Sequence, residues 1–179
     1  PVQNPFGLNF NSNISGYYYY GGKAQFADMD GDGDLDLLYE TRDIDTSYYS
    51  YYQNNVFMYH ENIGTVNNPQ FSLGVKNPFN LTSPQNSTLE FSLLSHNLVD
   101  LDNDGDLDIL ASYTGFYGDY NAQTGDYDYE ANTIFKYYEN IGNPVIPLFA
   151  AQQSNPFGLS IDSMIAISDI VDIDGDGDY

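Results

Sequence analysis

Short apolar runs alternate with polar turn residues along the whole chain. Within the first 76 residues, runs of strand length lie at 25–27, 35–41, 56–61 and 70–75. Clusters of Gly, Asn, Asp and Pro separate these runs, and no segment shows a sustained helical period. The pattern therefore predicts an all-β chain in which the strands of each unit form a four-stranded antiparallel meander.

The same order of parts returns along the chain. NPFGL at 4–8 recurs as NPFNL at 77–81 and as NPFGL at 155–159, and FMYHENIG at 57–64 matches FKYYENIG at 135–142. These markers predict tandem repeats, and a period this long is typical of blades or modules rather than helical arrays. The predicted divisions are the end of a preceding repeat at 1–3, repeat 1 at 4–76, repeat 2 at 77–154 and a truncated repeat 3 at 155–179.

An acidic loop is the most regular part of the repeat. DMDGDGDLD at 28–36 recurs as DLDNDGDLD at 100–108 and begins again as DIDGDGDY at 172–179, so the first aspartates are 72 residues apart (100 − 28 and 172 − 100). Carboxylates at alternating positions converge only if the backbone curls tightly, which glycine at position 6 permits. Converging carboxylates repel one another unless a cation lies between them.

Calcium is the cation that the loop chemistry favours. Calcium accepts about six to eight oxygen ligands, backbone carbonyls included, whereas magnesium prefers a strict octahedron and keeps its waters. We expect side-chain binding at loop positions 1, 3, 5 and 9 and binding through the carbonyl at position 7. The candidate ligands are Asp28, Asp30, Asp32, Asp34 and Asp36; Asp100, Asp102, Asp104, Asp106 and Asp108; and Asp172, Asp174, Asp176 and Asp178.

The acidic loop has two other interpretations. An EF-hand needs a bidentate acid at position 12, where this chain has Tyr39 or Ala111, and the flanking runs have strand length rather than helical length. A solvated acidic turn without metal would suit one isolated copy, but three copies at equal spacing argue against it. The sequence therefore predicts a strand-loop-strand calcium site.

These motifs resemble the FG-GAP or VCBS type of calcium-binding repeat, whose pattern is F-x-D-x-D-x-D-G-x-x-D-L followed by Y-x-E-N-x-G. Residues 26–37 and 99–109 carry the first part, and the third loop ends before position 9. In that family the units are β-propeller blades of secreted or surface proteins, including those of Bacteroidetes. The resemblance therefore implies blade-like repeats in an extracellular protein.

The charge balance argues against some classes of binding partner. The chain has 4 basic and 26 acidic residues and a formal net charge of −22, so nucleic acid and anionic membrane surfaces are poor partners. Fourteen of the acids lie in the three loops, where a cation would partly neutralise them. We expect calcium to be the main partner.

The sequence has no cysteine, no long apolar run and no signal peptide, and these features bear on the location of the protein. The chain has no cysteine, so no disulfide joins the repeats, and we expect calcium to take that stabilising role. Extracellular calcium modules bind at about 0.1 to 1 mM, where only external calcium suffices. No apolar run approaches the ~20 residues of a membrane span, and no signal peptide begins at Pro1. We expect an extracellular or cell-surface segment without membrane insertion.

Assembly is expected from the number of repeats. A propeller closes with about 4 to 8 blades, and about two and a third units cannot close one. We therefore expect a segment of a longer array, or self-association with neighbouring repeats of the same protein. An open array of stacked units is the alternative to a closed propeller.

Tyrosine clusters leave a second class of function open. The chain has 18 tyrosines, concentrated at 17–20, at 48–52 and from 113 to 129, and the last two clusters lie in variable insertions. Such insertions could bind a glycan or a surface protein, and the alternative is cross-strand packing along extended hairpins. Asn13, Asn80, Asn86 and Ser163 lie in glycosylation patterns that occur often by chance.

Catalysis is not expected. His60 and His96 occupy different repeat positions, cysteine is absent, and the conspicuous acids are assigned to metal. The sequence predicts a calcium-binding structural repeat segment of an adhesion or fibre-forming protein. A lectin-like propeller or a non-catalytic accessory region of a secreted enzyme is the alternative.

Overall fold

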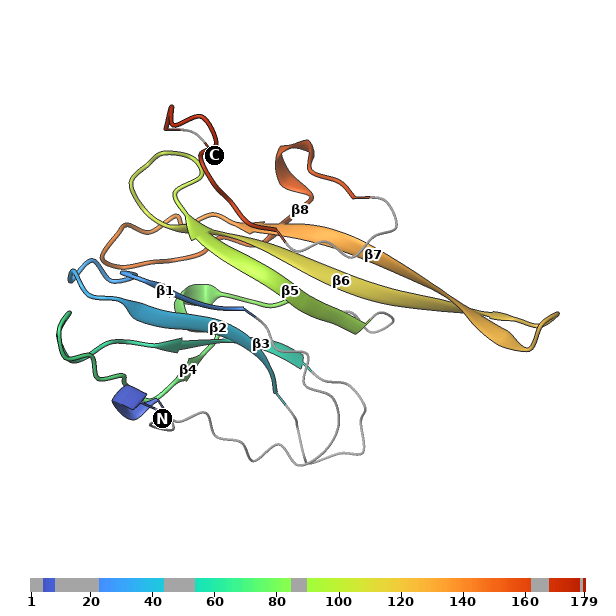
Figure 1. Cartoon of the computed structure of the whole chain (residues 1–179), viewed down its shortest axis with the longest axis horizontal. Coiled ribbons are helices and arrows are strands. Elements are labelled where there is room, and N and C mark those ends of the chain that lie inside the picture. Colours follow the sequence, from blue (N-terminus) through green and yellow to red (C-terminus); the bar gives the residue numbers. More distant parts are fainter. Residues whose placement is uncertain (1–4, 9–22, 44–53, 85–89, 162–167, 178) are drawn as a thin grey trace.

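The structure is a computed structural model that describes residues 5–8, 23–43, 54–84, 90–161, 168–177 and 179, with only the backbone described at some strand ends. This part contains two four-stranded antiparallel sheets, each with its strands in chain order (Figure 1). The all-β prediction and the four-stranded antiparallel arrangement are confirmed. The strands are β1 (Ala24–Ala27), β2 (Asp36–Asp43), β3 (Asn54–His60) and β4 (Val75–Lys76) in the first sheet, and β5 (Glu90–Val99), β6 (Asp108–Asn121), β7 (Asp126–Tyr138) and β8 (Gln153–Ser154) in the second.

The two sheets have the same register at corresponding residues. Ala27 pairs with Asp36 in the first sheet as Val99 pairs with Asp108 in the second. The outer pairs agree as well, because the β3–β4 register recurs 78 residues later between β7 and β8. The sequence repeat is thus also a repeat of strand order and hydrogen bonding.

The predicted fourth strand at 70–75 was placed too early, because β4 covers only Val75–Lys76. The Asn62 side chain changes the path of the chain before that strand. Its Oδ1 accepts hydrogen bonds from the backbone N–H groups of Gly64 at 3.1 Å and Gln70 at 3.0 Å. Residues 62–71 therefore form a closed turn, joined at an isolated bridge between Asn62 and Phe71, instead of extending the sheet.

The second tyrosine-rich insertion is an extended hairpin rather than a loop. β6 and β7 stay paired from Ile109 and Tyr138 to Asn121 and Asp126, and their far end projects beyond both sheets (Figure 1). The hairpin alternative is thus the one that the backbone adopts.

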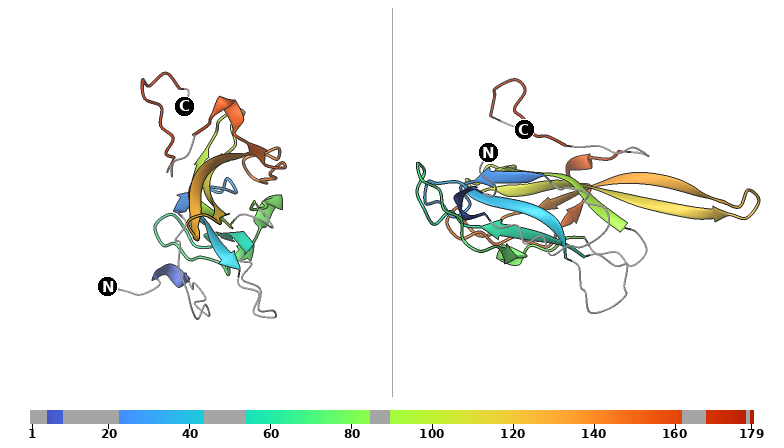
Figure 2. Two further views of the ribbon diagram at one scale, coloured as in Figure 1. Left: turned by 90° about the vertical axis from the view of Figure 1, so that its right-hand side faces the viewer. Right: turned by 60° about the horizontal axis from the view of Figure 1, so that its bottom comes forward.

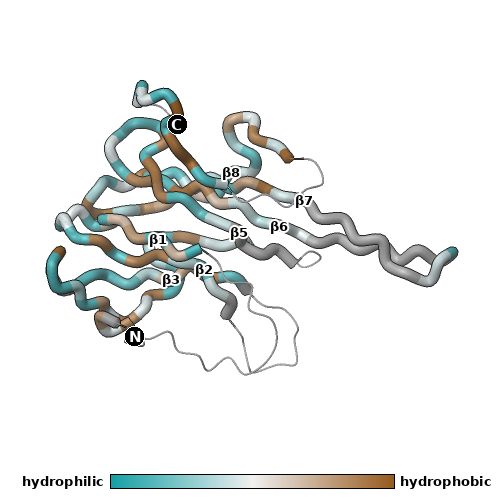
Figure 3. Tube along the Cα trace, viewed as in Figure 1, coloured by the Kyte–Doolittle hydropathy of each residue, from teal (hydrophilic) through white to brown (hydrophobic). Residues whose placement is uncertain are grey.

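The main core lies between the two sheets, which stack face to face (Figure 2). Apolar positions follow the strands of both sheets and return along the C-terminal segment (Figure 3). Full burial of one large apolar side chain contributes about 1.5 to 3 kcal/mol, so this layer joins the sheets firmly. The buried members are Met29, Leu38, Phe57, Tyr59 and Leu81 on one side and Ile109, Ala111, Tyr113, Tyr138 and Phe149 on the other.

Each NPF sequence forms a 3-10 turn, η1 (Pro5–Gly7), η2 (Pro78–Asn80) or η3 (Pro156–Gly158). η2 connects the sheets. Before it, Asn77 exchanges two hydrogen bonds with Phe57 of β3, through its backbone N–H at 2.7 Å and its side-chain oxygen at 3.0 Å. After it, the Phe79 carbonyl accepts a hydrogen bond from the Phe149 N–H at 2.9 Å, so one short motif holds parts of both sheets.

The C-terminal segment lies on the outer side of the second sheet (Figure 1). Ser168 exchanges hydrogen bonds with Ser95 of β5, including one from its N–H to the Ser95 hydroxyl at 3.1 Å. Between the sheets, Gln25 of β1 accepts a hydrogen bond from the Leu98 N–H of β5 at 2.9 Å. Residues 168–171 thus lie beside β5 in the way that β5 lies beside β1. Among the described residues, no helix is long and apolar enough to cross a membrane.

Candidate metal centre

The acidic loops connect or follow the first strand of each repeat. Residues 28–36 join β1 to β2, residues 100–108 join β5 to β6, and the third loop follows the segment beside β5. Glycine at position 6 is left-handed in all three, with φ of 93° at Gly33, 99° at Gly105 and 98° at Gly177. A residue with a Cβ is strained in this region, so the predicted role of glycine in curling the loop is confirmed.

The position-1 carboxylate organises each loop by accepting backbone hydrogen bonds. In the first loop, Asp28 accepts from the N–H of Gly31 at 2.8 Å and of Gly33 at 3.0 Å. Asp172 does the same in the third loop, and hydrogen bonds from Gly177 and Gly175 lower the pKa of its carboxyl. The backbone of each loop is therefore wrapped around its position-1 carboxylate.

The structure brings together the carboxylates at positions 1, 3 and 5 of each loop. In each of the three groups, one oxygen per residue lies within 4.8 Å of the others. The groups are Asp28, Asp30 and Asp32; Asp100, Asp102 and Asp104; and Asp172, Asp174 and Asp176. Positions 7 and 9 are not members of these groups, and Asp178 lies outside the described residues.

The position-7 carboxylate is buried and is repelled by neighbouring negative charges. Asp34 and Asp106 are only 6% and 5% exposed, and Oδ1 of each has no hydrogen-bond partner. Burial, followed by the negative charges of Asp32, Asp30 and Asp28, raises the pKa of Asp34. Burial and the neighbouring aspartates raise the pKa of Asp106 to about 6. A divalent cation in each loop would offset this repulsion, so the donor set fits a hard cation.

Position 9 is satisfied by the protein itself. Asp36 is 1% exposed and accepts hydrogen bonds from the N–H of Asn62 at 2.8 Å, the N–H of Met29 at 3.2 Å and the hydroxyl of Tyr59 at 2.9 Å. Burial raises its pKa to about 6 against the lowering effect of these three bonds. The carboxylate predicted as the last ligand therefore lies beneath the loop, bonded to the strand behind it.

The second loop repeats the position-9 arrangement with the same partners. Asp108 is 1% exposed and accepts hydrogen bonds from the N–H of Asn140 at 2.8 Å, the N–H of Leu101 at 3.1 Å and the hydroxyl of Tyr137 at 2.8 Å. Burial raises the pKa of Asp108 too.

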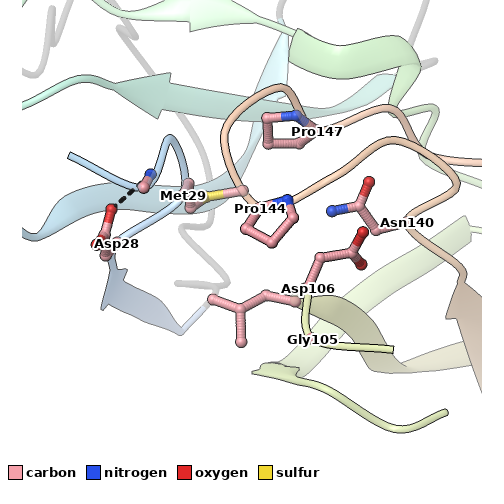
Figure 4. Close-up of a pocket in the computed structure, with 9 residues that line it drawn as sticks. Asp28, Met29, Gly105, Asp106, Asn140, Pro144 and Pro147 are labelled. Carbon is pink, nitrogen blue, oxygen red and sulfur yellow. Dashed lines mark hydrogen bonds between the residues drawn. The ribbon is translucent and has the colours of Figure 1, made fainter. Parts of the chain in front are cut away.

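The first loop also contacts the second sheet. A Cβ at Gly31 would lie 3.1 Å from both the Pro144 carbonyl oxygen and a methyl group of Val145. A cavity of about 110 Å³ lies at this junction, lined by residues of both loops and of the turn after β7. Met29 faces Pro144 across it, and the Asp106 carboxylate points towards Asn140 (Figure 4). The first loop is thus part of the contact between the sheets.

The three carboxylate groups offer only oxygen donors, which suits binding of a hard cation rather than redox or acyl-transfer chemistry. The two histidines lie apart from them, on different strands. His60 belongs to β3 and interacts with the Ser72 carbonyl at 2.9 Å. His96 belongs to β5, is fully buried, and has its pKa lowered to about 4 by burial.

The partners of position 9 are not among the site residues that the loop motif predicts. In the sequence, Tyr59 and Asn62, with Tyr137 and Asn140, stand out only as markers of the repeat. A signal was present, because both types recur at the same places in 57–64 and 135–142, and the two positions on either side of the tyrosine differ between the repeats.

Several predicted features lie outside the described residues. These are the tyrosine clusters at 17–20 and 48–52 and the glycosylation candidates Asn13, Asn86 and Ser163. Asn80 is described and exposed, and its side-chain N–H donates to the Phe149 carbonyl at 3.0 Å. Its modification and the glycan-binding alternative stay predictions.

No protein-family model matches this chain, and no curated protein or solved structure matches it. The likeness to FG-GAP or VCBS repeats therefore rests on the loop and strand motifs of the chain itself.

Proposed function

We propose that the chain is a calcium-binding structural repeat segment of a secreted or cell-surface protein that serves adhesion or builds a fibre. The observation that carries the proposal is the threefold recurrence of one carboxylate group at loop positions 1, 3 and 5. A chance acidic turn does not explain three copies with the same glycine conformation and the same wrapping around the first aspartate.

Calcium stabilises the fold in this proposal. The loops join strands within each sheet, and the first loop also touches the second sheet, so neutralising its charge would favour both contacts. The chain has no disulfide to do this work. External calcium, available near the millimolar range typical of extracellular modules, suits such a role.

The outer side of the second sheet supports packing against further repeats. A groove of about 500 Å³ runs along it, between the sheet and residues 168–173. Five apolar residues in or beside this groove correspond to those that the first sheet buries against the second, 72 or 78 positions earlier in the chain. The counterparts of Met29, Leu38, Phe57, Tyr59 and Leu81 are Leu101, Leu110, Phe135, Tyr137 and Leu159.

This equivalence supports a directional array in which the same sheet face receives the next repeat each time, as in blade-like folds. The expected occupant is therefore another sheet of the same repeat, either within one protein or from a neighbouring copy. Exposed apolar residues that line the groove, Phe157, Val171 and Ile173, are typical of an interaction surface.

Thermal unfolding with and without a chelator tests the calcium proposal. At free calcium 100 times the dissociation constant, each occupied site adds about 2.7 kcal/mol to the free energy of unfolding. We expect the melting temperature to rise with calcium and to rise much less with magnesium, which adapts poorly to such a cage. An unchanged melting temperature, or an equal rise with magnesium, contradicts the proposal.

A further inference from the structure

The position-9 aspartates make the same contacts in both complete loops. Each is 1% exposed and accepts three hydrogen bonds, from a loop N–H, from a tyrosine hydroxyl on the third strand of its sheet, and from an asparagine N–H just after that strand. The residues are Asp36 with Met29, Tyr59 and Asn62, and Asp108 with Leu101, Tyr137 and Asn140.

The position-9 carboxylates have few acceptor sites left for a cation. An ionised carboxylate has about four lone-pair sites on its two oxygens, and three donors already occupy each of these groups. Bidentate binding of a cation is therefore incompatible with the hydrogen bonds. Asp36 and Asp108 also lie outside the groups whose oxygens are within 4.8 Å of one another.

We propose that Asp36 and Asp108 are positioning residues that fix the loops from beneath, with Tyr59 and Tyr137 as their anchors, while the carboxylates at positions 1, 3 and 5 face the cation. The inference rests on the proposed calcium function and departs from the family pattern, in which the ninth residue is an expected ligand. It makes two tyrosines, which touch no cation, determinants of calcium affinity.

The anchor extends into the rest of each sheet. The Asn62 side chain closes the turn at 62–71, and the Phe71 N–H in that turn donates to the Phe6 carbonyl at 3.0 Å. Asn140 closes the corresponding turn, in which Phe149 bonds to Phe79. The loop is thus held by the same hydrogen-bond network that reaches the NPF connectors.

The decisive variants are Tyr137→Phe and Tyr138→Phe in the full chain. Tyr137 donates to Asp108 at 2.8 Å. Tyr138, the next residue on β7, is also buried, but its hydroxyl interacts with the Tyr113 hydroxyl at 3.3 Å and with Gln152 at 3.5 Å, neither of which belongs to an acidic loop. Both changes remove one buried hydroxyl, and only the first removes a support of the loop.

Calcium titration calorimetry at neutral pH measures the result. We expect Tyr137→Phe to weaken calcium binding at one site roughly tenfold, the factor that corresponds to loss of about 1.4 kcal/mol, and Tyr138→Phe to leave affinity unchanged. Tyr59→Phe repeats the test for the first loop. Unchanged affinity in Tyr137→Phe, or equal weakening in Tyr138→Phe, overturns the positioning role.

A second measurement separates a support from a ligand. Europium luminescence lifetimes in H₂O and D₂O count the waters on each bound ion. For a double variant with Asp36→Asn and Asp108→Asn, we expect the water count of the wild type. A count higher by about one or more per ion shows that the carboxylates bind the cation and overturns the proposal.

The outcomes distinguish the inference from the function on which it rests. If the wild-type chain binds neither calcium nor europium, the calcium function itself fails. If the wild type binds, but Tyr137→Phe leaves the calcium affinity unchanged or the double asparagine variant has a higher water count, only the positioning role fails. If the asparagine variant does not fold, the tyrosine pair still decides the matter.

Discussion

Glu40 on β2 is a carboxyl group buried in the contact between the two sheets, and its removal should stabilise the protein in a pH-dependent way. It is 4% exposed and accepts a hydrogen bond from the Tyr113 hydroxyl at 2.7 Å. Burial raises its pKa from 4.5 to about 8, although hydrogen bonds from Tyr113 and Ser83 act in the opposite direction. The perturbation is Glu40→Gln, which keeps the shape and the acceptor oxygen and removes the ionisation.

The sign and size follow from proton linkage. Because the pKa is raised on folding, the folded state holds the proton more tightly than the unfolded state between pH 4.5 and 8. The free energy of unfolding of the wild type therefore falls by about 1.4 kcal/mol per pH unit across this window. Glu40→Gln has no group that ionises at this position and does not lose this stability. Its free energy of unfolding should therefore exceed that of the wild type by about 1 kcal/mol at pH 5, about 3 kcal/mol at pH 7 and about 4 kcal/mol at pH 8.

Urea unfolding at pH 5, 6, 7 and 8 with saturating calcium measures this advantage. All other ionisable groups are common to the two proteins, so the difference between variant and wild type isolates Glu40. Glu61→Gln is the matched control, because Glu61 lies exposed just after β3; we expect a change within about 0.5 kcal/mol. A difference that is constant from pH 5 to pH 8 refutes the reasoning.

Two further predictions concern the loops and the outer groove. Asp104→Ala removes a member of the second carboxylate group and should weaken calcium binding strongly, whereas Asp106→Ala keeps the position-7 carbonyl and should weaken it mildly. Calorimetry compares the two, and equal losses would show that position 7 binds through its side chain. Light scattering should detect calcium-dependent oligomers that a chelator reverses, and Phe157→Asn, which removes an exposed ring from the groove, should weaken them. The matched change Phe6→Asn, at an exposed ring outside the groove, should not, and a compact monomer at millimolar calcium contradicts the assembly.

Local pattern was enough to predict the class and the repeated order of parts. Apolar runs of strand length separated by turn residues specify antiparallel strands, and the spacing of the acidic loops specifies where each repeat begins again. Glycine at position 6 could be assigned its role from the residue type alone, because few other residues adopt a left-handed backbone without strain. These features depend on neighbouring residues, which the sequence displays directly.

The fourth strand and the role of position 9 could not be settled from local pattern. Whether residues 70–75 extend a sheet depends on the Asn62 side chain, which takes the backbone N–H of Gln70. Whether Asp108 faces a cation or supports the loop depends on Tyr137 and Asn140, which lie 29 and 32 residues away along the chain. A hydrogen bond at that separation leaves no periodic trace in the sequence.

The contact between the sheets was also decided only in three dimensions. Glu40 lies on a predicted strand, and its sequence neighbours do not indicate that a tyrosine 73 residues later will cover it. Gly31 belongs to a loop with an evident local role, yet it also meets Pro144 and Val145 in the turn after β7. The sequence by itself determined the all-β class, the acidic loops and their repetition. Tertiary structure decided which charged groups are buried and which remain to face a cation, because burial depends on how the two sheets pack together.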